Sequence, residues 1–97
     1  MSKRSNELSL GEAIQDMVRE LGLQERLDAA EVVTIYDEVV GPLIARHTRR
    51  VALKRGTLII EVDSSPLRQE ISYLKEDIRS RINERMKRQV VTSVTLR

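Results

Sequence analysis

Residues 50–65, RVALKRGTLIIEVDSS, decide the fold because their apolar side chains recur at every second position. The pair Arg55-Gly56 divides the segment into two strands joined by a turn. Apolar residues of both strands share one face: Val51, Leu53, Leu58, Ile60 and Val62. Ala52 and Ile59 fall on the other face, which indicates that this second face is not purely polar. The segment therefore predicts a β-hairpin with one buried face.

A first helix is predicted upstream, from Ser9 to the glycine at position 22. Ser9 and Glu12 have the spacing of a capping box, and Gly22 suits a left-handed helix end. Its apolar residues recur at helical spacing: Leu10, Ile14, Met17, Val18 and Leu21. We expect residues 1–8 to form a flexible arm before this helix.

A second helix is predicted in residues 28–41, DAAEVVTIYDEVVG. Asp28 begins another capping box, and Gly41 suits the helix end. Pro42 is well placed at the first position of a short helical turn, and His47 follows at the corner into the first strand. One side of this second helix is apolar: Val32, Ile35, Tyr36, Val39 and Val40.

Downstream of the hairpin, one long helix is predicted to begin at Ser65-Pro66 and to bury a stripe that ends near Ile82. The stripe consists of Leu67, Ile71, Leu74, Ile78 and Ile82. Residues 90–97, VVTSVTLR, are rich in β-branched side chains and predict a third strand. A crossover helix precedes that strand, so it can pair in parallel with an earlier one. The order α-α-β-β-α-β predicts a two-layer α+β fold, with helices on one face of a three-stranded mixed sheet.

Composition and charge bound the function. The 97 residues suffice for one small domain, the chain has no cysteine, and no apolar run approaches the ~20 residues of a membrane span. Its start has no apolar signal region, so we expect a soluble cytoplasmic protein without membrane contact.

Residues 1–45 contain four basic and nine acidic side chains, whereas residues 46–97 contain thirteen basic and six acidic. A basic half favours a polyanionic partner such as nucleic acid, although a merely uneven soluble surface is the alternative.

No catalytic residues are indicated by the sequence. His47 is the only histidine, and no nucleophile elbow, metal-binding pair of histidines or phosphate loop occurs. We therefore expect a protein that is not an enzyme and uses no metal or cofactor, with His47 serving either as a polar residue at the corner or as a helper in anion binding.

Basic side chains around the hairpin and on the long helix are the candidate phosphate contacts. Those around the hairpin have no acidic neighbour in sequence before Glu61. Those on the helix lie within about 40° of one another at 100° per residue. The candidate nucleic-acid-binding residues are Arg46, Arg49, Arg50, Lys54, Arg55, Arg68, Lys75 and Arg79. The helix start at residues 64–66 is a second candidate anion site, since free N–H groups attract phosphate.

Four further basic residues near the end of the helix have two interpretations: Arg81, Arg85, Lys87 and Arg88. They can contact phosphate, or they can form ion pairs within the helix, with Asp77–Arg81 and Glu84–Arg88 as the expected pairs. Tyr73 points away from the apolar stripe and is either an interface residue or a surface aromatic.

The order of several short motifs resembles the DciA family over about residues 27–97. The motifs are Tyr36, Val40-Gly41, Ile44-Ala45, His47-Thr48, Gly56, Leu58, Val62, Ser64-Ser65, Leu67, Glu70-Ile71, Leu74, Ile82-Asn83 and Val94-Thr95-Leu96-Arg97. Residues 9–97 are accordingly expected to form a single KH-like domain of the DciA type. The resemblance implies a bacterial, nucleoid-associated protein that assists loading of the DnaB-type replicative helicase at replication initiation and binds single-stranded or forked DNA.

The chain departs from true KH domains because no G-x-x-G loop occurs between Ser65 and Arg88. Basic side chains would then have to make any DNA contact. Two alternatives remain open. One is a protein-interaction module without nucleic-acid binding, which would use the acidic first helices or the Ala52/Ile59 face of the sheet. The other is an RNA-binding KH-like module.

Overall fold

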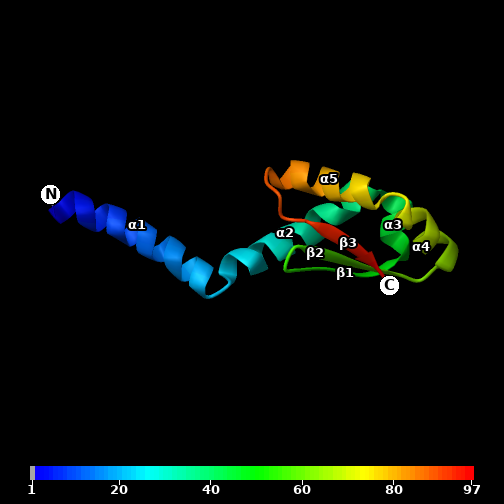
Figure 1. The fold of residues 1–97 in the computed structure, drawn as a ribbon, viewed down its shortest axis with the longest axis horizontal. Coiled ribbons are helices and arrows are strands. Elements are labelled where there is room, and N and C mark those ends of the chain that lie inside the picture. Colours follow the sequence, from blue (N-terminus) through cyan, green and yellow to red (C-terminus); the bar gives the residue numbers. More distant parts are fainter. Residues whose placement is uncertain (1) are drawn as a thin grey trace.

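The hairpin of residues 50–65 lies in the middle of a computed structural model, which describes the backbone of residues 2–97 and the side chains of residues 9–17 and 19–97 (Figure 1). The elements along the chain are α1 (Ser2–Glu20), α2 (Leu23–Val40), α3 (Pro42–His47), β1 (Thr48–Lys54), β2 (Thr57–Val62), α4 (Ser65–Ser72), α5 (Lys75–Met86) and β3 (Ser93–Leu96). The fold is α+β with a three-stranded mixed sheet, which confirms the predicted class.

The sheet has the order β1-β2-β3, with β2 antiparallel to β1 and parallel to β3. Leu53 pairs with Leu58 across the predicted turn, where Arg55 and Gly56 both have positive φ angles of 50° and 82°. Two successive positive φ values are typical of the tight turns that match the twist of a hairpin. The parallel pairing of β3, which places Leu58 beside Val94, confirms the crossover expected from the sequence.

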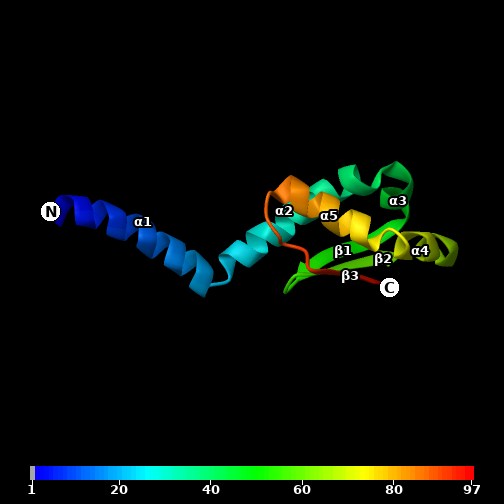
Figure 2. The ribbon, with the colours of Figure 1, turned by 45° about the horizontal axis from the view of Figure 1, so that its top comes forward.

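Helices α2, α4 and α5 cover one face of this sheet, and the opposite face stays open (Figure 2). The core between the two layers consists of Val32, Tyr36, Leu53, Leu58, Ile60, Val62, Ile71, Ile78, Ile82, Met86, Val91 and Val94. Tyr36 is fully buried, and its hydroxyl lies 2.9 Å from the Thr48 hydroxyl, which donates to the Ile44 carbonyl. Burial raises the pKa of Tyr36. This hydrogen-bond chain joins α2 to α3 and β1.

The prediction of a single long helix after the hairpin is wrong, because a turn at Tyr73 and Leu74 divides this segment into α4 and α5. Both residues donate their N–H groups to carbonyls three positions back rather than four. A straight helix over residues 65–86 would be about 33 Å long, whereas a six-residue strand spans about 20 Å. The turn keeps both halves over the sheet. The buried stripe also extends beyond Ile82, to Met86.

Asn83 is the one buried polar residue among the described side chains, and it fixes the connection from α5 to β3. Its amide donates to the carbonyl of Val91 at 2.9 Å, and its oxygen accepts the N–H groups of Val90 and Val91 at 3.0 and 2.8 Å. These bonds satisfy the backbone where the chain enters the core without regular structure.

Helix α1 projects away from the sheet, so the prediction that all helices lie on the sheet is wrong for this one (Figure 1). Gly22, with φ 68°, turns the chain between α1 and α2, and the molecule measures 63 × 21 × 19 Å. The sheet face is already covered by the other helices, which leaves α1 without a place on it. The side chains of the arm predicted in residues 1–8 lie outside the described residues.

The prediction that the two capping boxes begin helices is wrong in both cases. Ser9 lies inside α1, which begins at Ser2, and Asp28 lies inside α2, which begins at Leu23. The glycine turn between these helices sets the boundary of α2 instead. The Asp28 carboxylate is used in the tertiary structure, where it accepts hydrogen bonds from Arg88 and Gln24.

Candidate nucleic-acid interface

Three of the predicted phosphate contacts gather where α3 passes into β1. Arg46 lies in the last turn of α3, and Arg49 and Arg50 lie at the start of β1. The strand register shifts between Thr48 and Arg50, so Arg49 is an extra residue in the ladder. Arg50 pairs with Glu61 of β2 at 3.3 Å, whereas Arg46 and Arg49 have no ion-pair partner among the described side chains. Two exposed guanidinium groups are therefore available at this end of the sheet.

His47 lies beside these arginines and serves as the polar corner residue expected from the sequence. Its Nδ1 lies 3.0 Å from a carboxylate oxygen of Asp63, and its carbonyl accepts the Asp63 N–H at 3.1 Å. These contacts hold the end of α3 against the end of β2.

Lys54 and Arg55 occupy the tip of the hairpin, at the other end of β1. They follow Arg49 by five and six positions, which separates them from it by roughly 17 to 20 Å along the strand. The backbone N–H of Arg55 donates to a carboxylate oxygen of Glu25 on α2 at 3.1 Å. The structure thus divides the five basic residues around the hairpin into two separate groups.

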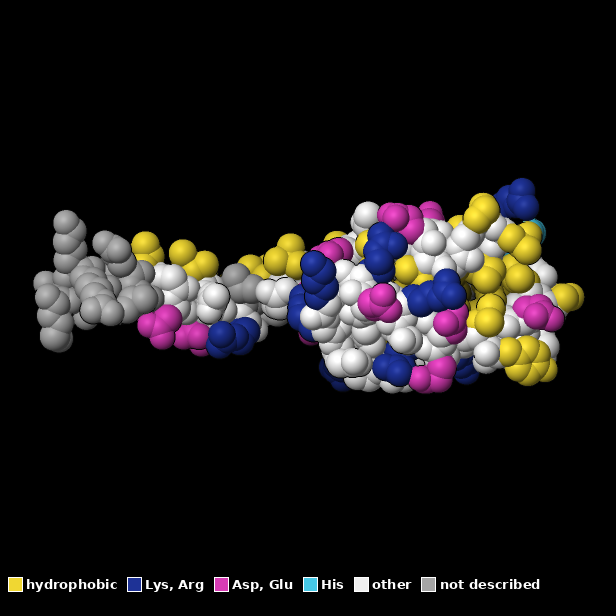
Figure 3. Space-filling view, turned by 90° about the horizontal axis from the view of Figure 1, so that it is seen from above, with side chains coloured by type: hydrophobic (Ala, Val, Ile, Leu, Met, Phe, Trp, Pro, Cys, Tyr) yellow, Lys and Arg dark blue, Asp and Glu magenta, His cyan; other side chains and the backbone are white. Residues whose placement is uncertain are grey.

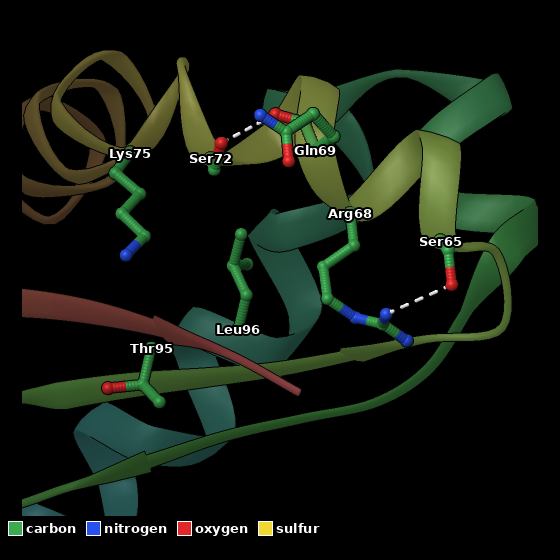
Figure 4. Close-up of a pocket in the computed structure, with 7 residues that line it drawn as sticks. All are labelled: Ser65, Arg68, Gln69, Ser72, Lys75, Thr95 and Leu96. Atoms are coloured by element: carbon green, nitrogen blue, oxygen red, sulfur yellow. Dashed lines mark hydrogen bonds between the residues drawn. The ribbon is translucent and has the colours of Figure 1, made fainter.

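A cleft of about 480 Å³ between α4 and β3 brings together Arg68 and Lys75 (Figure 4). These two side chains extend into the cleft from opposite sides, Arg68 from α4 and Lys75 from the start of α5. The remaining lining residues are mostly small or polar: Ser65, Gln69, Ser72, Thr95 and Leu96. Hydroxyl, amide and cationic groups around one cleft can bind an oxyanion such as phosphate.

Arg68 lines this cleft, with its guanidinium turned toward Ser65 (Figure 4). Its guanidinium donates to the Val62 carbonyl at 3.2 Å and to the Ser65 hydroxyl at 3.4 Å, while its buried Nε has no hydrogen-bond partner. Buried donors in proteins are rarely left unpaired. This Nε is enclosed by protein atoms, so it is an unpaired donor inside the protein rather than a contact for an anion in the cleft.

Arg79 does not line the cleft, although it lies one turn after Lys75 on α5. Its guanidinium binds Glu76 on the same helix, with a shortest distance of 2.7 Å, and this contact lowers the pKa of Glu76. Arg79 is thus held by an acidic neighbour on its own helix.

The basic residues at the end of α5 mostly form ion pairs. Arg81 pairs with Asp77 at 3.1 Å, as predicted, and Arg85 pairs with Glu38 of α2 at 2.9 Å. The expected Glu84–Arg88 pair is wrong, because Arg88 reaches Asp28 on α2. Hydrogen bonding from Arg88 lowers the pKa of Asp28. Three of these arginines therefore have acidic partners, two of them across the α2–α5 contact.

The helix start at Ser64 is already capped, since its hydroxyl accepts the N–H of Leu67 at 3.3 Å. The turn between α4 and α5 contains no glycine, and Tyr73 there is exposed. Neither feature therefore adds an anion site to the cleft.

Arg97 and Thr95 are the residues that sequence reasoning missed. Arg97 donates its N–H to Ile60 and accepts from Val62, which places it next to Glu61 at the basic end of the sheet. Thr95 borders the cleft beside a helix that lies more than 20 residues away in sequence, with its side chain directed away from α4 (Figure 4). Only the parallel pairing of β3 reveals these positions, because no local pattern links them to α4.

Other kinds of site are not seen in the described residues. No group of three metal-ligating side chains occurs among them. None of the described helices combines the length and apolarity needed to cross a membrane.

Comparison with known proteins identifies a family. No individual protein of curated function matches the sequence. Residues 9–96, nearly the whole chain, match the family described as Dna[CI] antecedent, DciA. The chain therefore belongs to the DciA family.

Proposed function

We propose that this protein is a non-enzymatic DNA-binding accessory of the DnaB-type replicative helicase in bacterial replication initiation. Membership of the DciA family suggests a role related to loading of that helicase. DNA binding rests on the structure and on electrostatics. The cytoplasm, near the nucleoid, is the location that this role requires.

One observation supports DNA binding most strongly: two basic groups converge on the same end of the sheet. The start of β1 and the end of β3 both pair with the C-terminal part of β2. Arg46 and Arg49 therefore lie on one side of β2, and the cleft of Arg68 and Lys75 lies on the other. Strands spaced about 4.8 Å apart place the backbones of β1 and β3 roughly 10 Å from each other. A single strand of DNA can contact both groups.

Charge variants test this interface. The double variant Arg46→Glu/Arg49→Glu and the double variant Arg68→Ala/Lys75→Ala should each weaken binding to single-stranded and forked DNA. Fluorescence anisotropy across a salt series measures the effect. The slope of log affinity against log salt should become shallower by about 0.7 for each lost contact with single-stranded phosphate.

Arg81→Glu is the matched control, because Arg81 is exposed, is paired with Asp77 and lies away from the cleft. The pair Lys54→Ala/Arg55→Ala at the hairpin tip should have a smaller effect than the variants at the basic end. Binding that is absent at low salt, or equal losses in all four variants, would contradict the proposed interface. Competition with RNA of the same length distinguishes the RNA-binding alternative.

The helicase role requires a separate experiment. Co-purification with the host DnaB-type helicase, followed by helicase loading on forked DNA with and without this protein, measures it. Helicase capture that is unaffected by the DNA-binding variants and by nuclease would support the protein-interaction alternative. The open sheet face with half-buried Ala52 and Ile59 is the surface that favours this second candidate.

A further inference from the structure

Helix α1 and the residue that follows it, Leu21, expose a stripe of large apolar side chains that no other part of the described structure covers. Leu10, Ile14, Met17 and Leu21 are 65, 53, 56 and 59% exposed. Figure 3 shows apolar side chains in a row along one edge of the projecting helix and charged side chains along the opposite edge. Monomeric soluble proteins rarely present such a contiguous apolar row.

The spacing of this stripe is that of a helix–helix seam. Its members are separated by four, three and four residues, which is the alternation of the a and d positions of a coiled coil. Glu12, Asp16 and Arg19 lie more than about 120° from the centre of the stripe. The nearest flanking residues that are described include Gly11 and Ala13, which have no charge. The seam is therefore apolar at its centre and almost uncharged at its borders.

We infer that the α1 stripe binds the same stripe of a second copy of this chain, with the two helices antiparallel. The spacing reads the same in both directions, so a two-fold rotation places Leu10 opposite Leu21 and Ile14 opposite Met17. A self-complementary patch of this kind is what a closed dimer with two-fold symmetry requires. Glu20, the one acidic residue at the border, then lies on the same flank as Ala13 of the partner rather than against another carboxylate.

The shape of the molecule favours the antiparallel arrangement. The sheet and its helices lie at one end of α1 (Figure 1), so antiparallel pairing puts the two bodies at opposite ends of the helix pair. Parallel pairing would place both bodies side by side. A helix of a different protein is less favoured as the occupant, because charges at the seam borders usually select such partners and are nearly absent here.

The size of the seam sets how tightly the copies associate. Stable interfaces bury about 800 Å² on each partner, and a 19-residue helix is only about 28 Å long. The dimer should therefore dissociate on dilution. Sedimentation velocity of the whole protein over a range of concentrations should show a reversible monomer–dimer equilibrium.

Ile14→Glu introduces a charge into the centre of the seam and should shift the dissociation constant upward by at least tenfold. Gln15→Glu adds the same charge about 130° away from the stripe and should leave it unchanged. Circular dichroism checks that both variants keep their helix content. A protein that is monomeric at all concentrations, or a dimer that Ile14→Glu does not weaken, overturns the inference.

Cross-linking tests the orientation, since the chain has no cysteine of its own. A mixture of Leu10→Cys and Leu21→Cys proteins should form a disulfide-linked heterodimer under mild oxidation, while neither protein alone should cross-link efficiently, because these two positions lie opposite each other only in the antiparallel pair. Efficient cross-linking of each variant with itself would overturn the antiparallel arrangement. A monomer whose binding to the helicase is abolished by Ile14→Glu would show instead that the stripe binds the helicase, and would leave the proposed function intact.

Discussion

Gly56 combines two constraints at one position of the hairpin turn. Its φ is +82°, and a Cβ atom there would lie 2.7 Å from the Thr92 hydroxyl. Its carbonyl also accepts both the backbone N–H and the hydroxyl of Thr92, at 2.7 and 3.1 Å. The glycine therefore allows the turn and also allows the chain entering β3 to approach it closely.

Gly56→Ala should lower the free energy of unfolding by about 1–3 kcal/mol. Positive φ and the contact with Thr92 both contribute to this loss. Gly22→Ala is the matched control, because Gly22 has φ +68° but open space around its Cβ position. Urea denaturation measures both variants. If Gly22→Ala costs as much as Gly56→Ala, the close approach of Thr92 has no energetic effect.

At the scale of elements, Asp28 and Arg88 join α2 to the segment that follows α5. The Asp28 side chain is only 13% exposed, so water screens this pair less than the surface pairs on α1. A carboxyl whose pKa is lowered by folding contributes stability above its unfolded pKa and loses that contribution as pH falls through its folded pKa.

Asp28→Asn should therefore lower the Tm at pH 7, and the difference from the parent protein should shrink as pH falls below about 4. Thermal unfolding followed by circular dichroism between pH 7 and pH 2.5 measures this dependence. Asp16→Asn serves as the control, since Asp16 pairs with Arg19 on the exposed surface of α1. A difference that persists unchanged at pH 2.5 would argue against the ion pair as its cause.

At the scale of the whole molecule, stability resides in the body formed by α2 to β3. None of the described side chains of α1 belongs to the core. Deletion of residues 1–21 should therefore leave cooperative unfolding and change the Tm by only a few degrees, apart from any effect of lost self-association. Ile71→Ala in the full chain removes a fully buried side chain and should cost about 2–5 kcal/mol. A truncated chain that no longer unfolds cooperatively would show that α1 stabilises the body.

The sequence by itself determined the hairpin, its buried face, the third strand and the order of elements. These follow from period-two alternation and from turn residues, which act between neighbours in the chain. The resemblance to the DciA family also depended only on the order and spacing of short motifs. The pair Asp77–Arg81 was predictable for the same reason, because i,i+4 positions meet on any helix.

Only the tertiary structure decided where α1 lies, where the long helix breaks and which basic residues meet. A periodic apolar stripe is the same in sequence whether it is buried, as in α5, or exposed, as in α1. Lys75 joins Arg68 at the cleft, whereas Arg79 and Arg88 turn to acidic partners, and Lys54 lies a strand's length from Arg49. These outcomes depend on strand pairing and helix packing between residues that are distant in sequence. The local periodicity of the sequence carries no information about such contacts.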